Sequence, residues 1–252
     1  MQFLAEKAGE ASDSFRRRIG SESGRSPSQV RSSREAQPPL DEYYNSLFTA
    51  LGPQHWWPSE TRFEVIVGAI LTQNTAWKNV EQALENLRGA GLLSFAALEK
   101  ASLQKLERLI RPSGFFRQKA RKLKAFVDFV RSQYAGSLKR MFEDPTPLLR
   151  EKLLGVFGIG PETADSILLY AGKRPVFVVD TYTRRVLVRH AWTQEKSRYQ
   201  DIRRMFERKF PGNTATFNEF HALIVHTGKT WCCTHDPDCG HCPLGRYLEE
   251  GR

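Results

Sequence analysis

Several features that would place a protein in a membrane or outside the cell are missing from this sequence of 252 residues. No apolar run reaches the roughly 18 residues that a membrane-spanning helix needs. The first residues contain no basic stretch followed by an apolar core, so we expect no secretory signal. Cysteine is scarce, and its four residues are confined to one stretch near the C-terminus. Such clustering disfavours a disulfide framework, so we expect a cytoplasmic protein with no membrane association.

Negative charge is also in the minority, because 28 Asp and Glu stand against 38 Lys and Arg, a formal net charge of +10. A basic surface suits a polyanionic partner, with nucleic acid ahead of an anionic membrane. The first 39 residues are rich in Ser, Arg, Glu and Gly and show no apolar periodicity. We therefore expect a disordered tail over 1–39 and one folded domain over 40–252.

The alternation of apolar and polar residues that marks half-buried strands is missing as well. Apolar residues instead recur at helical spacing through most of the domain, and only the short segment 175–179 is β-branched. The pattern predicts an all-α fold with helical segments over 43–51, 63–71, 77–92, 103–110, 119–134, 145–154, 163–170, 181–191, 199–206 and 217–227.

Two glycines, Gly158 and Gly160, flank one apolar residue between two amphipathic segments. Such a pair permits a tight turn with positive φ, and the turn exposes backbone N–H groups beside the start of the next helix. Those groups and the helix dipole favour a phosphate, so we expect Gly158, Ile159, Gly160 and Thr163 to contact a nucleic-acid backbone. From the glycines alone, an ordinary helix–turn–helix corner is the simpler interpretation.

The residues after this turn favour the nucleic-acid interpretation. One carboxylate, Asp180, follows directly after the apolar segment Val176–Val179. The run 158–190 resembles the helix-hairpin-helix and Gly/Pro-Asp signature of the endonuclease III superfamily of DNA glycosylases. Ile70–Thr75 resembles a second signature of that family, and the Cys-rich end of the chain resembles a third. Together these matches extend from about 41 to 244.

The resemblance implies a two-lobed helical fold with a central cleft and a Cys-rich loop over 232–242. It implies a monomeric, nucleoid-associated base-excision-repair enzyme whose partner is double-stranded DNA containing damaged bases, and it implies that Asp180 is the catalytic carboxylate. Breaking an N-glycosidic bond builds positive charge on the sugar, which a fixed negative charge stabilises while it orients or deprotonates water. An Asp at this place is also typical of a helix N-cap, and both roles are compatible.

Some relatives also cleave the DNA strand, through a lysine at the start of the second hairpin helix that forms a Schiff base. In this sequence Glu162 follows Pro161 at that position, and neither residue can form an imine. We therefore predict a monofunctional glycosylase. Two alternatives stay open: a bifunctional glycosylase and lyase acting on oxidised pyrimidines, and a DNA-binding hairpin protein without catalytic activity.

Aromatic residues gather ahead of the second signature, where Trp56, Trp57, Pro58 and Trp77 are expected to form the base pocket. An extruded base stacks on aromatic faces, and a cationic ring does so with extra attraction. We therefore expect an alkylated base, and these residues most resemble the 3-methyladenine DNA glycosylase III branch of the family. Ordinary core packing is the alternative for each tryptophan.

Three polar residues are expected to contact DNA. By the resemblance, Gln73, with Asn74 beside it, enters the gap left by the extruded base or contacts the orphaned partner. Lys119 lies in a basic segment that offers phosphate contacts. A helix-terminal residue without a special role accounts for Gln73 as well, and a solvated basic face accounts for Lys119.

The cysteines Cys232, Cys239 and Cys242 have the spacing of the first three ligands of the family's four-iron, four-sulfur loop. The resemblance places a fourth cysteine where this sequence has Leu248, and Cys233 is additional. We expect a 4Fe-4S cluster held by Cys232, Cys239 and Cys242, with Cys233 among the candidates for the fourth ligand. A zinc site and a loop without metal stay open as alternatives.

Overall fold

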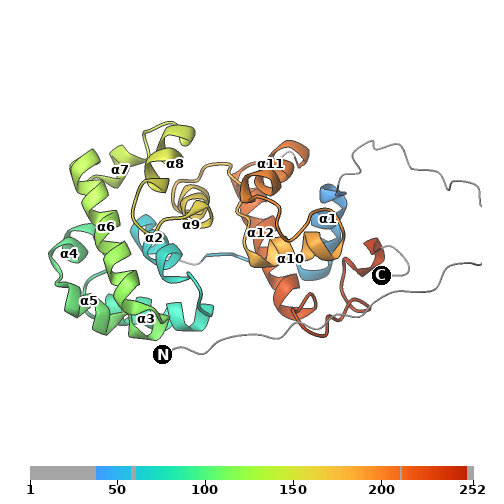
Figure 1. Ribbon diagram of the computed structural model, residues 1–252, viewed down its shortest axis with the longest axis horizontal. Coiled ribbons are helices and arrows are strands. Elements are labelled where there is room, and N and C mark those ends of the chain that lie inside the picture. The colour runs from blue at the N-terminus through green and yellow to red at the C-terminus, as the bar shows by residue number, and fades with distance from the viewer. Residues whose placement is uncertain (1–37, 58–60, 211, 249–252) are drawn as a thin grey trace, which may run out of the picture. The chain divides into compact units, whose positions relative to one another are not determined.

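The computed structural model describes residues 38–57, 61–210 and 212–248. Every regular element within these ranges is helical (Figure 1), which confirms the expected all-α fold. Apart from its last two residues, the predicted disordered tail lies outside the described part of the chain. In that described part, no helix combines the length and the apolar character needed to cross a membrane.

The helices between residues 62 and 171 form one group, drawn from cyan to yellow in Figure 1. Its longest helix, α6, packs against α2, α4, α5 and α7. The group consists of α2 (Arg62–Leu71), α3 (Trp77–Gly89), α4 (Phe95–Lys100), α5 (Leu103–Leu109), η1 (Arg111–Ser113), α6 (Phe116–Tyr134), α7 (Leu138–Met141), α8 (Thr146–Leu154), α9 (Pro161–Ser166) and the turn η2 (Ile167–Ala171).

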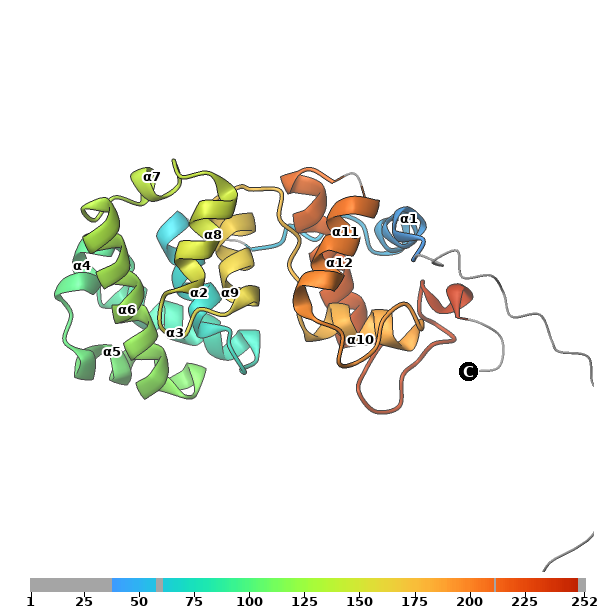
Figure 2. The same cartoon turned by 45° about the horizontal axis from the view of Figure 1, so that its top comes forward.

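The second group brings the first helix together with the last ones. Helix α12 (Thr214–Thr230) packs against both α1 (Leu40–Leu51) and α10 (Thr181–Arg189), as Figures 1 and 2 show. Helix α11 (Tyr199–Lys209) and the short turn η3 (Gly245–Tyr247) complete this group. The chain therefore passes from the second group to the first after α1 and returns after η2.

Local sequence explains where several helices begin. The side chains of Thr61, Ser94, Ser102 and Asn213 each accept a hydrogen bond from the backbone N–H three residues later. Short polar side chains are preferred at this position because they satisfy an N–H group that the helix leaves unpaired. From Phe63 onward every residue of helix α2 is buried, and all of these except Glu64 are apolar, as expected for a helix inside the core.

The structure differs from the sequence-based expectations at a few places. Helices α4 and α7 are too short to show a helical repeat, and the sequence did not predict them. The helix expected over 163–170 begins at Pro161, and its last turn, η2, has π geometry. Such turns hold an extra residue and are frequent at functional sites. The β-branched segment 175–179 forms no regular secondary structure.

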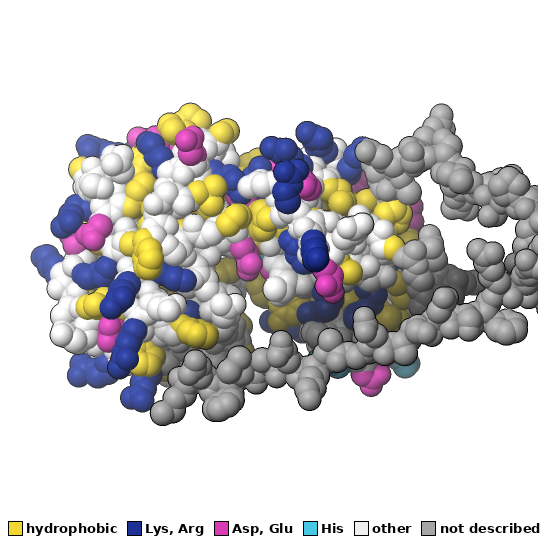
Figure 3. All heavy atoms as spheres, in the orientation of Figure 1, with side chains coloured by type: hydrophobic (Ala, Val, Ile, Leu, Met, Phe, Trp, Pro, Cys, Tyr) yellow, Lys and Arg dark blue, Asp and Glu magenta, His cyan; other side chains and the backbone are white. Residues whose placement is uncertain are grey.

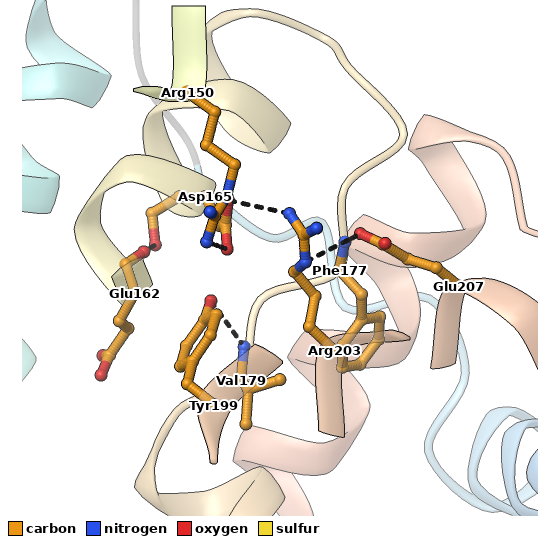
Figure 4. A network of polar contacts seen from close by, with 9 residues as sticks. Arg150, Glu162, Asp165, Phe177, Val179, Tyr199, Arg203 and Glu207 are labelled. Carbon is orange, nitrogen blue, oxygen red and sulfur yellow. Dashed lines mark hydrogen bonds and ion pairs between the residues drawn. The ribbon is translucent and has the colours of Figure 1, made fainter. Parts of the chain in front are cut away.

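A buried carboxylate connects the two groups of helices. Asp165 in α9 is fully buried and accepts hydrogen bonds of 2.6 and 3.0 Å from Arg150 of α8. Arg203 of α11 lies 3.6 Å from the same carboxylate and 3.6 Å from Glu207. Figure 4 shows these side chains as one connected network. Because buried charges are stable only when they are paired, the network fixes α11 relative to α8 and α9.

The same network holds the segment that leads to Asp180. Glu207 accepts a hydrogen bond of 3.1 Å from the N–H of Phe177, and the hydroxyl of Tyr199 accepts one of 3.3 Å from the N–H of Val179. Both contacts are visible in Figure 4. They satisfy backbone groups that have no strand partner, and they fix the point at which the segment ends and α10 begins.

Substituting Asp165→Asn is expected to lower the free energy of unfolding by about 3–5 kcal/mol, because two guanidinium groups would then lie near a buried neutral amide. Urea denaturation followed by circular dichroism measures the change. The matched control is Asp201→Asn, whose carboxylate pairs with Arg198 at the surface, where the two side chains are 46% and 83% exposed. This variant should lose less than about 1 kcal/mol. Equal losses in the two variants would contradict a central role for Asp165.

Candidate active site

A cleft of about 880 Å³ opens between the two groups of helices. The first group contributes the end of α2, the start of α3, the glycine hairpin and the start of α9. The second group contributes α10, α11, α12 and the segment that follows α1. The structure thereby brings Asp180, the two hairpin glycines and the three candidate pocket tryptophans to one site.

Asp180 is held at the start of α10 by contacts to both of its oxygens. Oδ1 accepts a hydrogen bond of 2.7 Å from the N–H of Thr183, so the residue is the N-cap of this helix. Oδ2 lies 3.5 Å from Nε2 of His221, and the carboxylate is 11% exposed. Burial disfavours ionisation, but the proximity of His221 and the hydrogen bonds outweigh it and hold the pKa of Asp180 below its ordinary value. The carboxylate is therefore ionised at neutral pH.

A second carboxylate, Glu162, lies in the first turn of α9 and lines the same cleft. Burial of the carboxyl group between the cleft walls, which removes it from water, raises the pKa of Glu162 to about 7, and the negative charge of Asp180 contributes to this rise. Water reaches the side chain on its open side and screens this effect. The cleft thus contains two carboxylates whose affinities for a proton differ.

Two buried residues beside Asp180 were not predicted from the sequence. His221 of α12 is 5% exposed, and its Nδ1 lies 2.5 Å from the hydroxyl of Tyr170 in the π turn. Each residue stands within an apolar stretch, where it is indistinguishable from a core residue. A separation of 51 residues between them leaves no local signal that they meet.

The tryptophans form one cluster at the cleft. Trp57 lies between Trp77, at a ring-centroid distance of 5.0 Å, and Tyr170, at 4.9 Å. Trp56 lies 6.4 Å from both of the other tryptophans. All three are half-buried and line the cleft, so they pack on the core with one side while the other side faces the cavity. Pro58, the fourth residue expected in the pocket, lies outside the described residues.

An exposed amine also lines the cleft. Lys229, near the end of α12, has its Nζ 5.7 Å from the ring centroid of Trp56. Nothing in its neighbourhood in the sequence distinguishes Lys229 from a solvated lysine, so the sequence did not predict its place in the cleft. Its position beside the tryptophan cluster lets it approach the edge of any ring bound there.

The hairpin has the expected turn at only one of its glycines. Gly158 has a φ of +78°, whereas Gly160 is extended, with φ and ψ of −89° and 179°. Pro161 occupies the first position of α9, where its missing N–H costs nothing. Ile159 is buried, and its N–H donates to the carbonyl of Val156. The N–H groups of Gly158 and Gly160 have no intramolecular acceptor among the described residues.

Gln73 links the end of α2 to the hairpin. Its Nε2 donates to the carbonyl of Gly158 at 3.0 Å and to the hydroxyl of Thr163 at 2.9 Å, and its Oε1 accepts from Lys122. Thr163 is buried, so its side chain supports Gln73 from inside the domain. Asn74 is exposed in the left-handed conformation and lines the cleft. An entry of Gln73 into a duplex would require it to exchange these hydrogen bonds.

The predicted phosphate contact at Lys119 is wrong in this structure. The side chain is 1% exposed, and its Nζ donates to the carbonyls of Leu71 and Ser113 at 2.8 and 2.6 Å. Burial, followed by the charge of Lys122, lowers the pKa of Lys119 to about 8. The amine connects the end of α2 to η1 inside the domain and cannot reach a phosphate from there. The basic character of the segment gave no sign of this burial.

The Cys-rich loop after α12 is attached to α10 by arginines, and Figure 2 shows the two side by side. Arg189 donates to Sγ of Cys232 at 2.8 Å and to the carbonyl of Cys233 at 2.9 Å. Arg185 donates to the carbonyl of Cys232 at 2.6 Å. The loop therefore has protein contacts of its own that hold it against the second group of helices.

The residues of this loop do not complete the set of ligands that an iron–sulfur cluster needs. Burial raises the pKa of Cys232 and Cys242, and the neighbouring thiols, including that of Cys239, raise it further. The thiol of Cys233 instead faces the backbone at the end of α12, and Leu248 offers no ligand. Among the described residues, no group of three or more His, Cys, Asp or Glu is arranged to hold a metal ion. A cluster in this loop stays a prediction.

Comparisons with known sequences agree with this arrangement. Residues 67–212 match the model of the HhH-GPD superfamily base excision DNA repair proteins. The chain is 44% identical over 205 residues to the putative DNA repair glycosylase MJ1434 of Methanocaldococcus jannaschii, covering 81% of this chain and 93% of that protein. It is 30% identical over 188 residues to endonuclease III of Sulfolobus acidocaldarius, covering 74% and 81%.

Solved structures show the same similarity. The 3-methyladenine DNA glycosylase MagIII of H. pylori, solved with 1,N6-ethenoadenine, matches with a TM-score of 0.67 at 28% identity, over 75% of this chain and 97% of that one. An endonuclease III bound to DNA matches with a TM-score of 0.71 at 20% identity, over 84% and 94%, and shares the fold. The helical architecture and the sequence match together show that the chain belongs to the HhH-GPD superfamily of base excision DNA repair glycosylases.

Proposed function

We propose that this protein is a monofunctional DNA glycosylase that hydrolyses the N-glycosidic bond of a damaged base, with Asp180 as its catalytic carboxylate. The observation that carries the proposal is an ionised carboxylate in a cleft lined by tryptophans and by the glycine hairpin. Double-stranded DNA is the proposed partner, and a monomer in the cytoplasm, at the nucleoid, is the proposed state.

The proposed reaction assigns a different task to each wall of the cleft. The extruded nucleotide places its base against the tryptophans and its sugar beside Asp180. As the glycosidic bond breaks, positive charge develops on the sugar, and the carboxylate stabilises it electrostatically. Asp180 also orients a water molecule and accepts its proton, and the released base takes up a proton in turn. These tasks require the carboxylate to be ionised, which agrees with its lowered pKa.

The aromatic cluster supports an alkylated base as the substrate. Trp56, Trp57 and Trp77 offer ring faces, and such faces attract a cationic ring through their quadrupoles. The similarity to MagIII of H. pylori, a 3-methyladenine glycosylase, points in the same direction. We propose that alkylated purines are the preferred substrates.

The hairpin supports contact with the DNA backbone. The N–H groups of Gly158 and Gly160 lie next to the start of α9, where the helix dipole favours a phosphate. Lys and Arg side chains also outnumber Asp and Glu on the face drawn in Figure 3. Such a surface binds the duplex without reading its sequence, so the proposed specificity comes from the pocket.

Substituting Asp180→Asn should reduce the single-turnover rate of excision by about 100- to 10,000-fold and leave binding to the same duplex intact, because the amide cannot carry the negative charge. Duplexes carrying 7-methylguanine, 1,N6-ethenoadenine, uracil or thymine glycol measure the rate and the base preference. Asp201→Asn at the surface is the control. Excision by Asp180→Asn at the wild-type rate would contradict the proposal.

The absence of strand cleavage can be tested with sodium borohydride, which reduces a Schiff base to a stable protein–DNA adduct. The wild-type protein is expected to form no adduct, because Glu162 stands where a lyase has its lysine. The variant Glu162→Lys places an amine in the cleft and should form one. An adduct with the wild type would instead support the bifunctional alternative. Loss of that adduct in Lys229→Ala would then identify Lys229, which lines the cleft, as the reacting amine.

The two hairpin glycines are expected to respond differently to alanine. In Gly158→Ala the residue would be strained at a φ of +78° and its Cβ would collide with Lys122, so the free energy of unfolding should fall by about 1–2 kcal/mol. Gly160→Ala meets no atom within 4 Å and should be as stable as the wild type. Both variants should weaken binding of an undamaged duplex, measured by fluorescence anisotropy.

The control for the glycine variants is Gly89→Ala at the end of α3, which also meets no atom within 4 Å and lies outside the cleft. It should leave DNA binding unchanged and should not lower the stability, because alanine is a better helix former than glycine. Wild-type affinity in both hairpin variants would show that the hairpin does not contact DNA.

A further inference from the structure

Beside the proposed catalytic carboxylate lies a buried histidine to which neither the sequence nor the comparisons assign a task. His221 is 5% exposed and is surrounded mainly by rings, with Trp56 and Phe177 each at a centroid distance of 6.4 Å. An imidazole has two nitrogens that need partners when it is buried, and an unpaired one is destabilising. The partners of these nitrogens therefore indicate what the residue does.

The two nitrogens face two different polar groups. Nδ1 lies 2.5 Å from the hydroxyl of Tyr170. Nε2 is buried and has no hydrogen-bond partner among the described residues, and it lies 3.5 Å from Oδ2 of Asp180. Glu162 is another titratable group of the cleft; burial and then the charge of Asp180 raise its pKa, and the proximity of His221 opposes this effect. Tyr170, His221 and Asp180 thus follow one another in a line.

We propose that Tyr170, His221 and Asp180 form a hydrogen-bonded chain in which His221 is the positioning residue for Asp180. The ionised carboxylate can only accept, so the imidazole carries a proton on Nε2, facing Oδ2. Nδ1 shares a hydrogen bond with the hydroxyl of Tyr170. The proposal rests on the proposed role of Asp180.

The protonation of the Tyr170 hydroxyl agrees with this arrangement. Its burial, followed by the negative charge of Asp180, raises the pKa of Tyr170 well above the ordinary value, so its hydroxyl keeps its proton. Its position is set by the π turn on one side and by Trp57 on the other.

The hydrogen-bonded chain of Tyr170, His221 and Asp180 determines how the carboxylate is oriented. The N–H of Thr183 holds Oδ1, and Nε2 of His221 holds Oδ2, so the plane of the carboxylate is fixed from two directions. Fixed orientation matters because electrostatic stabilisation of a developing charge depends on the position of the stabilising group before the reaction begins. These three side chains also contact the wall of the base pocket, because Tyr170 packs against Trp57.

Two substitutions of His221 by amide side chains distinguish the positioning role from simple core packing. The side-chain nitrogen of glutamine reaches about as far as Nε2, so His221→Gln keeps a donor toward Asp180. Asparagine is shorter and imitates the Nδ1 side, so His221→Asn loses that donor. We expect His221→Asn to lower the single-turnover rate on a 1,N6-ethenoadenine or 7-methylguanine duplex by about 10- to 100-fold, as for the loss of one hydrogen bond to a charged group. His221→Gln should restore most of that rate, and Tyr170→Phe should lower it by about 3- to 10-fold.

Affinity for the same duplex should be unchanged in these variants, because none of the substitutions alters the hairpin. His241→Asn serves as the control, since this histidine also contacts a carboxylate, Asp238, but is 84% exposed and lies outside the cleft. A merely structural role predicts that both His221 variants lose activity in proportion to their loss of thermal stability. That result, or a wild-type rate in His221→Asn, would overturn the proposal.

A double-mutant cycle separates this proposal from the one on which it rests. In an Asp180→Asn background, His221→Asn should have no further effect on the rate, because the group through which it acts is gone. An equal effect in both backgrounds would refute the positioning role. If Asp180→Asn alone kept the wild-type rate, the proposed function would fail; if Asp180→Asn were inactive and His221→Asn fully active, only the present inference would fail.

Discussion

The pairing of one buried carboxylate with arginines is the interaction on which the position of the site depends. Asp165 has no access to water, so its charge is stable only while Arg150 and Arg203 remain beside it. These residues belong to both groups of helices, and the same network reaches the backbone before Asp180 through Glu207. The geometry of the cleft is therefore determined by electrostatic requirements in the interior, away from the cleft itself.

The carboxylates of this region show how burial and partners produce different chemistry from one functional group. Asp165 is paired with Arg150 and Arg203, and its role is structural. Asp180 has partners at both oxygens yet opens onto the cleft, so it is ionised and still accessible. Glu162 lies in the wall of the cleft, where burial, followed by the charge of Asp180, raises its pKa to about 7. Proximity of two unlike carboxylates is a common feature of sites that transfer protons.

Much of the fold and part of the site could be predicted from the sequence, and the limit has a physical reason. Helical periodicity, the Gly158 turn and the N-cap at Asp180 are local properties, and each is present where it was expected. His221 and Tyr170 meet only through tertiary packing, so no local pattern reveals them. Lys119 shows the opposite error, because a basic segment indicates charge and cannot show which amine is turned inward.

The π turn η2 has a consequence for how the cleft is built. In an α-helix each residue is rotated by about 100° from the one before it, and a π turn accommodates one residue more. The direction of the Tyr170 hydroxyl thus depends on how the backbone is wound between Ile167 and Ala171, as well as on the presence of a tyrosine. Deleting a single residue beside Tyr170 in this turn would rewind the helix and turn the phenol away from the imidazole, even though Tyr170 and His221 were both retained.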